Sequence, residues 1–406
     1  MSLTPDMLRA LQQRSVVIHD PASVYIAADV VPDRIAPGVV IHSGCRITGA
    51  ETSIGPGCQL GEEAPVTIAQ CQLDRNVVVK GGYVANSVLL ANVTLGSAAH
   101  IRPGCLLEEA ATAGHAVGLK QTILMPGVTL GSLINFCDCL MAGGSGRKNH
   151  SEVGSSFVHF NFTPHGDKAT ASLLGDVPRG VMLDRPPIFL GGQGGIVGPV
   201  SIDFGVTVAA GVIVRTDVRG GAKLVTGNPS RADSATPYTP GLYGDIDRIV
   251  RANLAYIGNV RALLAWYRDV RQRFMTANPY SSACHRGAQA ILESILIERV
   301  RRLGELASNM RHSLDLAGSM PGFDLRSPRF AAQADLLHRG PLLTGALAQD
   351  LLHSRNEPAR ARFLTAIDAT PAETDYPDSI RSLDQSARDS GTAWLQSIVD
   401  GTLKLW

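Results

Sequence analysis

Bulky aliphatic residues return at every sixth position over long stretches of the first 240 residues. The clearest run is Leu190, Ile196, Ile202, Val208 and Val214, and small or polar residues fill most of the positions between them. A helix would repeat its apolar residues at intervals of three and four, and a half-buried strand at every second position. A period of six instead predicts a short strand followed by a sharp corner.

Three such sides of six residues make one coil of a triangular solenoid, about eighteen residues long. Each side points one aliphatic residue inward, and stacked coils pair as parallel strands around a buried column. Four further runs share the period: Ile35, Ile41 and Ile47; Ile54, Leu60 and Val66; Leu95, Ile101, Leu107, Ala113 and Leu119; Leu124, Leu130 and Phe136. One-residue slips or longer excursions separate the runs, and a coil can expel these as loops at its corners. We therefore expect a β-solenoid domain over residues 15–240.

From Ile246 onward the apolar period is that of amphipathic helices. Helices are predicted over 246–267, 288–316, 330–353, 359–367 and 379–403. The change of period places a boundary at residues 237–244 and an all-α domain over 241–406. Residues 1–14 are expected to form a short helix, with Thr4 as N-cap and Pro5 in its first turn.

Composition agrees with two folded domains and excludes several classes of protein. The chain has 406 residues, 45% of them hydrophobic, which is enough for large cores. A net charge of +1 without a basic stripe argues against a nucleic-acid partner. No segment is typical of a secretory signal or a membrane span. Seven cysteines without paired spacing indicate reduced thiols in a cytoplasmic protein. Cys137 and Cys139 have no second His/Cys pair at ligand spacing, so no metal site is inferred.

Four segments of the first domain resemble a known family. They are SVVIHDPASVYI (15–26), GSAAHIRPG (96–104), VGLK (117–120) and GVTVAAGVIVRTDV (205–218). Together they are similar to the acetyltransferase half of the bifunctional N-acetylglucosamine-1-phosphate uridylyltransferase/glucosamine-1-phosphate acetyltransferases, over roughly residues 15–231. The resemblance implies a left-handed parallel β-helix of hexapeptide repeats that assembles as a homotrimer. The chain starts where the family's nucleotidyltransferase half would end, so uridylyl transfer is not expected.

Arg102 and Lys120 are the candidate residues for holding a sugar phosphate. Each directly follows an inward aliphatic residue, and the two are 18 positions apart, so they should occupy the same place on successive coils. Neighbouring strands lie roughly 4.8 Å apart, and two cations so close repel unless an anion lies between them. In the family the matching residues hold the phosphosugar. The alternative is a pair of solvated side chains that splay apart.

The family's general base is a histidine, and here the sequence departs from the family. Its stretch of the type AGHLTYLGD corresponds to LGSLINFCD, which places Ser132 at the histidine and Asn135 at a sugar-binding tyrosine. Acetylation of an amine needs a group that removes the amine proton as the new bond forms. A serine hydroxyl does not supply such a base, so the catalytic group is unassigned.

Other histidines could replace the missing base. SSFVHFNFTPHGDKAT resembles a substrate loop of the family, with Asn161 on its asparagine and Lys168 on a lysine that contacts the sugar phosphate. His159 and His165 of this loop are candidate bases. Alternatively, His159 replaces an inward aliphatic residue of the core, and His165 caps a turn. His115 is a weaker candidate.

The resemblance also implies a groove for acetyl-CoA or another acyl-CoA. Ala209 and Ala210 match coils whose small side chains admit a pantetheine arm, although small residues also serve tight corners. VTGNPSR, residues 225–231, is similar to the ending of many hexapeptide acyltransferases, which makes Arg231 and Arg215 candidates for the coenzyme phosphates. Gly192 stands where the family has a serine.

Two excursions, residues 142–154 and 174–192, are longer than a hexapeptide coil allows. They carry Arg147, Lys148, Arg179 and Arg185. Such loops either enlarge a pocket, for example for a nucleotide-linked sugar, or cover an edge or meet another subunit.

Three functions remain open from the sequence. The first is acyl transfer to an aminosugar phosphate or a UDP-sugar with a displaced base. The second is a catalytically silent protein that binds the phosphosugar or nucleotide sugar. The third is a structural trimer that carries the helical domain. We favour the first because the basic pair, the groove residues and the GNPSR ending occur together.

Overall fold

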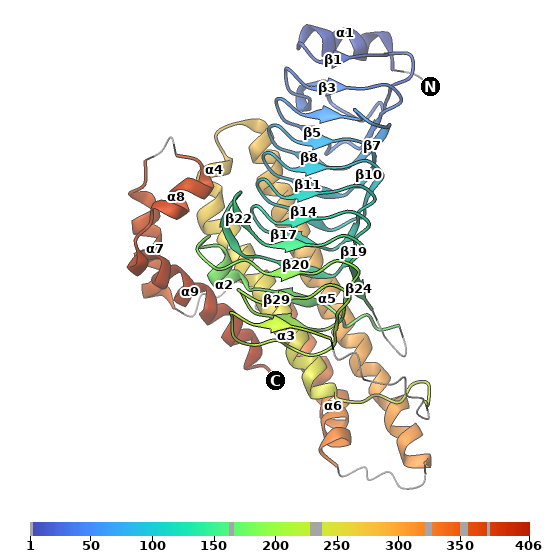
Figure 1. The fold of residues 1–406 in the computed structure, drawn as a ribbon, viewed down its shortest axis with the longest axis vertical. Coiled ribbons are helices and arrows are strands. Elements are labelled where there is room, and N and C mark those ends of the chain that lie inside the picture. Colours follow the sequence, from blue (N-terminus) through green and yellow to red (C-terminus); the bar gives the residue numbers. More distant parts are fainter. Residues whose placement is uncertain (1–2, 162–165, 228–237, 321–326, 350–355, 372–373) are drawn as a thin grey trace.

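The structure is a computed structural model that describes residues 3–161, 166–227, 238–320, 327–349, 356–371 and 374–406. It contains a parallel β-solenoid followed by helices that lie along one side of it (Figure 1). The β-solenoid and the helical C-terminal region predicted from the sequence are therefore confirmed.

Three parallel sheets, which we name sheets I, II and III, form the sides of the solenoid. Sheet I contains β1 (Val17–Ile18), β3 (Val40–Ile41), β6 (Gln59–Leu60), β9 (Val78–Val79), β12 (Thr94–Leu95), β15 (Thr112–Ala113), β18 (Thr129–Leu130), β23 (Glu152–Val153), β26 (Phe189–Leu190), β29 (Thr207–Val208) and β31 (Leu224–Val225). Sheet II contains β2 (Tyr25–Ile26), β4 (Arg46–Thr48), β7 (Val66–Ala69), β10 (Gly82–Ala85), β13 (Ala99–Ile101), β16 (Gly118–Lys120), β19 (Asn135–Cys137), β24 (Val158–Phe160), β27 (Gly195–Val197) and β30 (Ile213–Val214). Sheet III contains β5 (Ser53–Ile54), β8 (Gln72–Leu73), β11 (Ser87–Leu89), β14 (Cys105–Leu107), β17 (Ile123–Leu124), β20 (Cys139–Met141), β25 (Ser172–Leu174) and β28 (Ser201–Ile202).

The aliphatic residues of the six-residue period fill the interior of the solenoid. Ile101 of sheet II pairs with Leu119 of the next coil, 18 residues later. Leu107 of sheet III pairs with Leu124, only 17 residues later, because the side from Leu119 to Leu124 is one residue shorter. All of these side chains are fully buried, and each contributes about 1.5–3 kcal/mol through burial. One-residue slips therefore shorten a side without breaking the inner column.

Nine helices are described, seven of them after the solenoid. They are α1 (Pro5–Gln13), α2 (Val177–Gly180), α3 (Ile246–Trp266), α4 (Gln272–Met275), α5 (Pro279–Ser319), α6 (Pro328–Gln349), α7 (Glu357–Asp368), α8 (Tyr376–Ser382) and α9 (Gln385–Leu403). A π-helical turn, Tyr267–Arg271, joins α3 to α4. None of the described helices has both the length and the apolar character that crossing a membrane requires.

The helix predicted over residues 379–403 is two helices in the structure, and that expectation is corrected. Leu383 is extended, with ψ of 144°, and ends α8. The side chain of Asp384 then accepts a hydrogen bond from the backbone N–H of Ala387 and begins α9. An aspartate is a strong N-cap, and it stabilises a helix start that the apolar period alone does not indicate.

The two long excursions of the solenoid face the helical region. In the first, β21 (Gly144–Gly146) and β22 (Asn149–His150) form an antiparallel hairpin whose Gly146 lies beside Arg381 of α8. The second contains α2, which packs on α3 and α9. The sequence left open whether these excursions enlarge a pocket or instead cover an edge or meet another subunit. In the structure, the second excursion covers part of the helical region.

Helix α5 covers the outer face of sheet III. It packs on β5, β8, β11 and β14, while α3 packs on β25. At Gly287 the helix approaches so closely that an added Cβ would lie 2.2 Å from Oε1 of Gln72. The strands of sheet III are consequently buried on both faces, whereas sheets I and II keep exposed outward residues.

Two glutamates at one corner of the solenoid bind the π-helical turn. The hydroxyl of Tyr267 donates a hydrogen bond to Oε1 of Glu108 at 2.7 Å, and Arg271 forms an ion pair with Glu109 at 2.5 Å. The guanidinium of Arg271 is fully buried and lies over the ring of Tyr376, 3.8 Å from its centroid. Burial raises the pKa of Glu108 to about 7, and the nearby Glu109 carboxylate adds to this effect while Arg271 opposes it.

The raised pKa of Glu108 predicts a pH-dependent stability. The folded-state pKa of Glu108 lies above the ordinary value of 4.5, so the native state binds the proton more tightly than the unfolded state. This difference stabilises the folded state at low pH. The stabilisation is lost as pH rises from about 4.5 through about 7. Glu108→Gln keeps an acceptor for Tyr267 but does not titrate. We expect the melting temperature of the variant to rise relative to wild type between about pH 5 and about pH 8, measured by calorimetry. A difference in melting temperature that stays constant over this range would contradict the assignment.

Candidate functional site

Arg102 and Lys120 lie at equivalent positions of neighbouring coils, as their spacing predicts. Ile101 pairs with Leu119, and the backbone N–H of Arg102 donates to the carbonyl of Leu119 at 2.8 Å. In the next coil Cys137 pairs with Lys120. We name Arg102 and Lys120 the basic column.

The side chain of Arg102 reaches over the coil that carries Lys120. Its guanidinium donates a hydrogen bond to Sγ of Cys137, two coils away, at 3.1 Å. Burial raises the pKa of the Cys137 thiol even though Arg102 and Lys120 lower it, so the thiol stays neutral. The two cations thus lie on neighbouring coils at the outer face of sheet II, and the Asp138 carboxylate lies near Lys120.

A shallow groove of about 520 Å³ lies on this face, beside Arg102. His100, Arg102, Gly118 and Asn135 line it, and Leu133 stands at its edge. His100 pairs with Gly118, and Gly118 pairs with Asn135. An imidazole and an amide therefore flank a position that has no side chain, which makes room for a ligand. We name this feature the sheet II groove.

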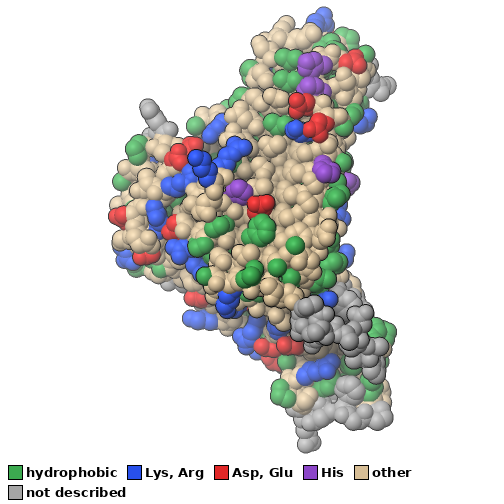
Figure 2. Space-filling model, viewed as in Figure 1, with side chains coloured by type: hydrophobic (Ala, Val, Ile, Leu, Met, Phe, Trp, Pro, Cys, Tyr) green, Lys and Arg blue, Asp and Glu red, His purple; other side chains and the backbone are tan. Residues whose placement is uncertain are grey.

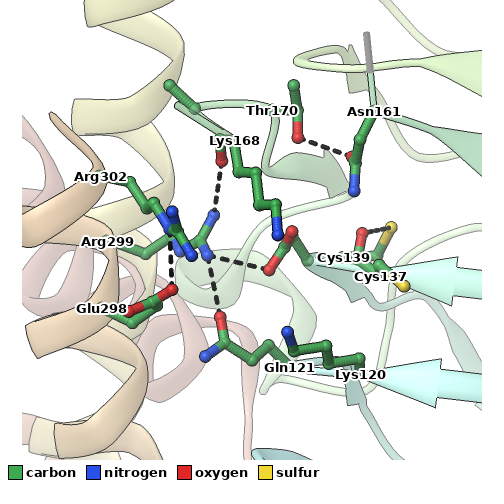
Figure 3. Close-up of polar contacts among 12 residues, drawn as sticks. Lys120, Gln121, Cys137, Cys139, Asn161, Lys168, Thr170, Glu298, Arg299 and Arg302 are labelled. Carbon is green, nitrogen blue, oxygen red and sulfur yellow. Dashed lines mark hydrogen bonds and ion pairs between the residues drawn. The ribbon is translucent and has the colours of Figure 1, made fainter. Parts of the chain in front are cut away.

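Lys120 lies next to a buried ion pair that the helical region completes (Figure 3). Arg299 of α5 forms an ion pair with Asp138 at 3.0 Å and donates to Oε1 of Gln121 at 2.9 Å. Burial raises the pKa of Asp138, whereas Arg299 and Lys120 lower it. Since the side chains of Arg299 and Asp138 are only 3% and 8% exposed, this pair fixes the corner that follows Lys120.

The loop that carries Asn161 and Lys168 ends at the same place. Arg299 donates a hydrogen bond to the carbonyl of Lys168 at 3.2 Å, and Thr170 donates to the side-chain oxygen of Asn161 at 2.6 Å. Both Asn161 and Lys168 have exposed side chains. The structure therefore brings these two predicted substrate residues into the neighbourhood of Lys120, and Arg299 of α5 holds the backbone of Lys168 there.

Ser132 lies at the corner between sheets I and II, across the groove from the basic column. The register places His115, Ser132, Ser155, Gly192 and Ala210 at the same corner of successive coils. The backbone N–H of Ser132 donates to Oγ of Ser155 at 3.1 Å. No described His, Asp or Glu side chain is hydrogen-bonded to the Ser132 hydroxyl, and His115 is one coil away.

His159 points into the core of the solenoid. It pairs with Ile196, is 4% exposed, and its Nε2 lies 2.8 Å from Oγ of Ser172. Burial lowers its pKa to about 4, so the ring is neutral near pH 7. These features favour the structural interpretation, in which His159 replaces an aliphatic residue. His165 lies outside the described residues.

The predicted coenzyme residues lie further along the solenoid. Ala209 and Ala210 are at the corner between sheets I and II, and Gly211 beside them has open space around it. Arg215 is exposed. It occupies the position equivalent to Lys120 four coils later, which at roughly 4.8 Å per coil places it about 19 Å from Lys120. Of the two cations predicted to contact the coenzyme phosphates, Arg215 lies within the described residues and Arg231 does not.

Three residues of this region were missed by the sequence analysis. His100 lies in the quoted GSAAHIRPG segment, and its pairing with Gly118 follows from a spacing of 18. Cys137 could have been found from its spacing of 17 to Lys120. No pattern in the sequence indicated Arg299, because this residue reaches Asp138 only through the packing of α5 on the solenoid.

Comparisons with known proteins identify relatives for about half of the chain. No protein-family model matches it. The chain is 31% identical over 222 residues to Bifunctional protein GlmU of Pelobacter propionicus, which covers 54% of this chain and 43% of that protein. It is 28% identical over 225 residues to Bifunctional protein GlmU of Mycolicibacterium smegmatis, covering 55% and 42%. The chain thus spans less than half the length of these curated relatives.

Among solved structures, LpxA from Acinetobacter baumannii matches 68% of this chain and 97% of its own, with 15% identity and a TM-score of 0.22. A TM-score of that size does not establish a common arrangement. The sequence similarity therefore relates this chain to proteins named GlmU, over a length close to that of the predicted solenoid.

Proposed function

We propose that the protein is an acyltransferase of the hexapeptide-repeat type that acts on the amine of an aminosugar phosphate or a UDP-sugar. The observation that carries this proposal is the sheet II groove, in which a cation, an amide and an imidazole surround an open position. The similarity to GlmU over 54% of the chain supports an aminosugar ligand.

The polar residues in and beside the groove divide the binding of the sugar phosphate between them. Arg102 binds the phosphate, and its planar guanidinium suits bidentate contacts to oxyanions. Asn135 can both donate to and accept from a sugar hydroxyl. Lys120, Asn161 and Lys168 extend the phosphate site toward the corner that Arg299 fixes.

His100 is the proposed base, because its imidazole lines the groove next to the open position. The amine nitrogen attacks the thioester carbonyl carbon, so an N–C bond forms and the C–S bond breaks. The proton leaves the amine for His100, and the thiolate of the coenzyme takes up a proton as it departs. This assignment differs from the sequence-based candidates His159 and His165.

An acyl-CoA is the proposed donor. Its pantetheine arm would follow the corner between sheets I and II, where Ser155, Gly192 and Ala210 have small side chains. Arg215, which is exposed, is the proposed contact for the coenzyme phosphates. All seven cysteines are free thiols, which supports a reducing, cytoplasmic setting for a thioester reaction.

One observation favours a second candidate, a catalytically silent protein that binds the phosphosugar. Ser132 occupies the position of the family's base, and its hydroxyl has no basic partner among the described side chains. In that case the groove would bind a sugar ligand without a coenzyme, and no acyl transfer would follow.

A homotrimer is proposed with either function. Because α5 covers sheet III, the outer faces of sheets I and II remain for contact, and they carry exposed Leu133, Phe160, Phe189, Ile213 and Leu224. A neighbouring subunit placed there would close the open side of the groove. Analytical ultracentrifugation should give three times the 43.0 kDa mass of one chain, and a species of 43.0 kDa alone would contradict the trimer.

Loss of the basic column should weaken sugar-phosphate binding. Arg102→Ala/Lys120→Ala removes two charge-assisted contacts, each contributing about 1.5–3 kcal/mol, so glucosamine 1-phosphate should bind at least about tenfold more weakly. The measurement is calorimetric titration with this ligand. The matched control is Arg219→Ala/Lys223→Ala, which removes two exposed cations from a turn far along the solenoid. Equal affinity of the wild type and the basic-column variant would remove the premise of both candidate functions.

Removal of the imidazole should affect the rate more than binding. For His100→Gln we expect kcat for acetyl transfer from acetyl-CoA to glucosamine 1-phosphate to fall about 10²–10⁴-fold, with the sugar affinity nearly unchanged. Ser132→Ala should retain most of the rate. If His100→Gln retains the wild-type rate while His115→Gln loses it, the base lies at the corner between sheets I and II instead.

A further inference from the structure

A second cleft lies on the other side of the solenoid from the sheet II groove. It has a volume of about 830 Å³ and separates the β21–β22 hairpin from α4 and α8. The solenoid contributes the corner between sheets III and I to it, including Arg75 and Ala110. The proposed acyl transfer uses none of these residues.

Three cations in this cleft have no protein partner. Arg75 lies on the solenoid corner, and Arg147 and Lys148 form the tip of the hairpin. Within the described ranges, none of the three side chains forms an ion pair or a hydrogen bond, and all three are exposed. Figure 2 shows Lys and Arg side chains gathered where the hairpin meets the helices.

The carboxylates that line the cleft are already occupied. Asp74 accepts hydrogen bonds from the backbone of Arg75 and from Ser281. Glu109 pairs with the buried Arg271, and Asp378 pairs with Arg381 at 2.8 Å. Asp375 caps α8 by accepting from the backbone N–H of Asp378. Asp74 and Asp375 accept only from neutral donors and keep their negative charges. The three unpaired cations outnumber these two carboxylates, so the lining of the cleft keeps a small net positive charge.

Part of the wall formed by the helices is apolar and aromatic, beside the paired side chains of Arg273, Asp378 and Arg381. Phe274 of α4 is half-buried and lies edge-to-face with Tyr376 of α8, with ring centroids 5.5 Å apart. Met275 and Pro377 continue this wall. A flat ring can pack on such a surface while an attached anion faces the opposite side of the cleft.

We propose that this cleft binds a nucleotide that carries two or more phosphates. The phosphates lie between Arg75 of the solenoid and Arg147 and Lys148 of the hairpin, and the base packs against Phe274. The volume is within the range of sites for ligands of this size. Because the ligand contacts both the hairpin and α4, binding would join the solenoid to the helical region. This site is separate from the sheet II groove, so it does not depend on the proposed acyl transfer.

The test is calorimetric titration of the full chain with ADP and, separately, with inorganic pyrophosphate. We expect Arg147→Ser/Lys148→Ser to weaken ADP binding at least about tenfold, because two cations contact the phosphates. Both residues are exposed at a hairpin tip, so the melting temperature should stay close to that of the wild type. Phe274→Leu should weaken ADP binding but leave pyrophosphate binding unchanged.

Two control variants locate the site. Arg219→Ser/Lys223→Ser removes the same charge elsewhere and should leave ADP affinity unchanged. Arg102→Ala/Lys120→Ala should also leave it unchanged, since the basic column is not part of the cleft. The proposal is overturned if the wild type does not bind ADP, or if binding survives loss of the hairpin cations. It is also overturned if the basic-column variant abolishes ADP binding, and the nucleotide assignment fails if Phe274→Leu has no effect on ADP.

Discussion

The register between successive coils is the constraint on which the rest of the structure depends. Each side of a coil points one aliphatic residue inward, and the inner column stays continuous only if equivalent residues pair from coil to coil, as Ile101 pairs with Leu119. Outward residues then stack at fixed intervals of 17 or 18. The basic column and the two flanks of the sheet II groove are products of that stacking. On such a scaffold, outward side chains that stack in neighbouring columns form a functional site, whereas in many folds a cluster of loops forms it.

The helical region makes the three sides of the solenoid unequal. Helix α5 buries the outer face of sheet III, and Arg299 extends from it to the corner that follows Lys120. The same arginine holds the carbonyl of Lys168, so the loop carrying Asn161 and Lys168 is tied to the helices as well as to the solenoid. The helical region thereby shapes the phosphate end of the proposed site. On the opposite corner, α4 and α8 form one wall of a second cleft.

The sequence predicted the parts of this structure that depend on local period. The solenoid, the stacking of Arg102 on Lys120 and the inward direction of His159 all follow from the spacing of aliphatic residues. The sheet II groove was missed, although the spacings of 18 and 17 that place Gly118 between His100 and Asn135 could have indicated it. Arg299 was beyond reach because it meets Asp138 across more than 150 residues of chain. The break between α8 and α9 depends on the capping of one aspartate.

The proposed function requires that the sheet II groove bind an aminosugar phosphate with its amine beside His100. A crystal structure of the protein with glucosamine 1-phosphate bound tests this. We expect a phosphate in contact with Arg102, and an amine within about 2.6–3.2 Å of the His100 imidazole. A sugar bound elsewhere on the molecule, or in the groove with its phosphate turned away from Arg102, would show that the groove is not the acceptor site.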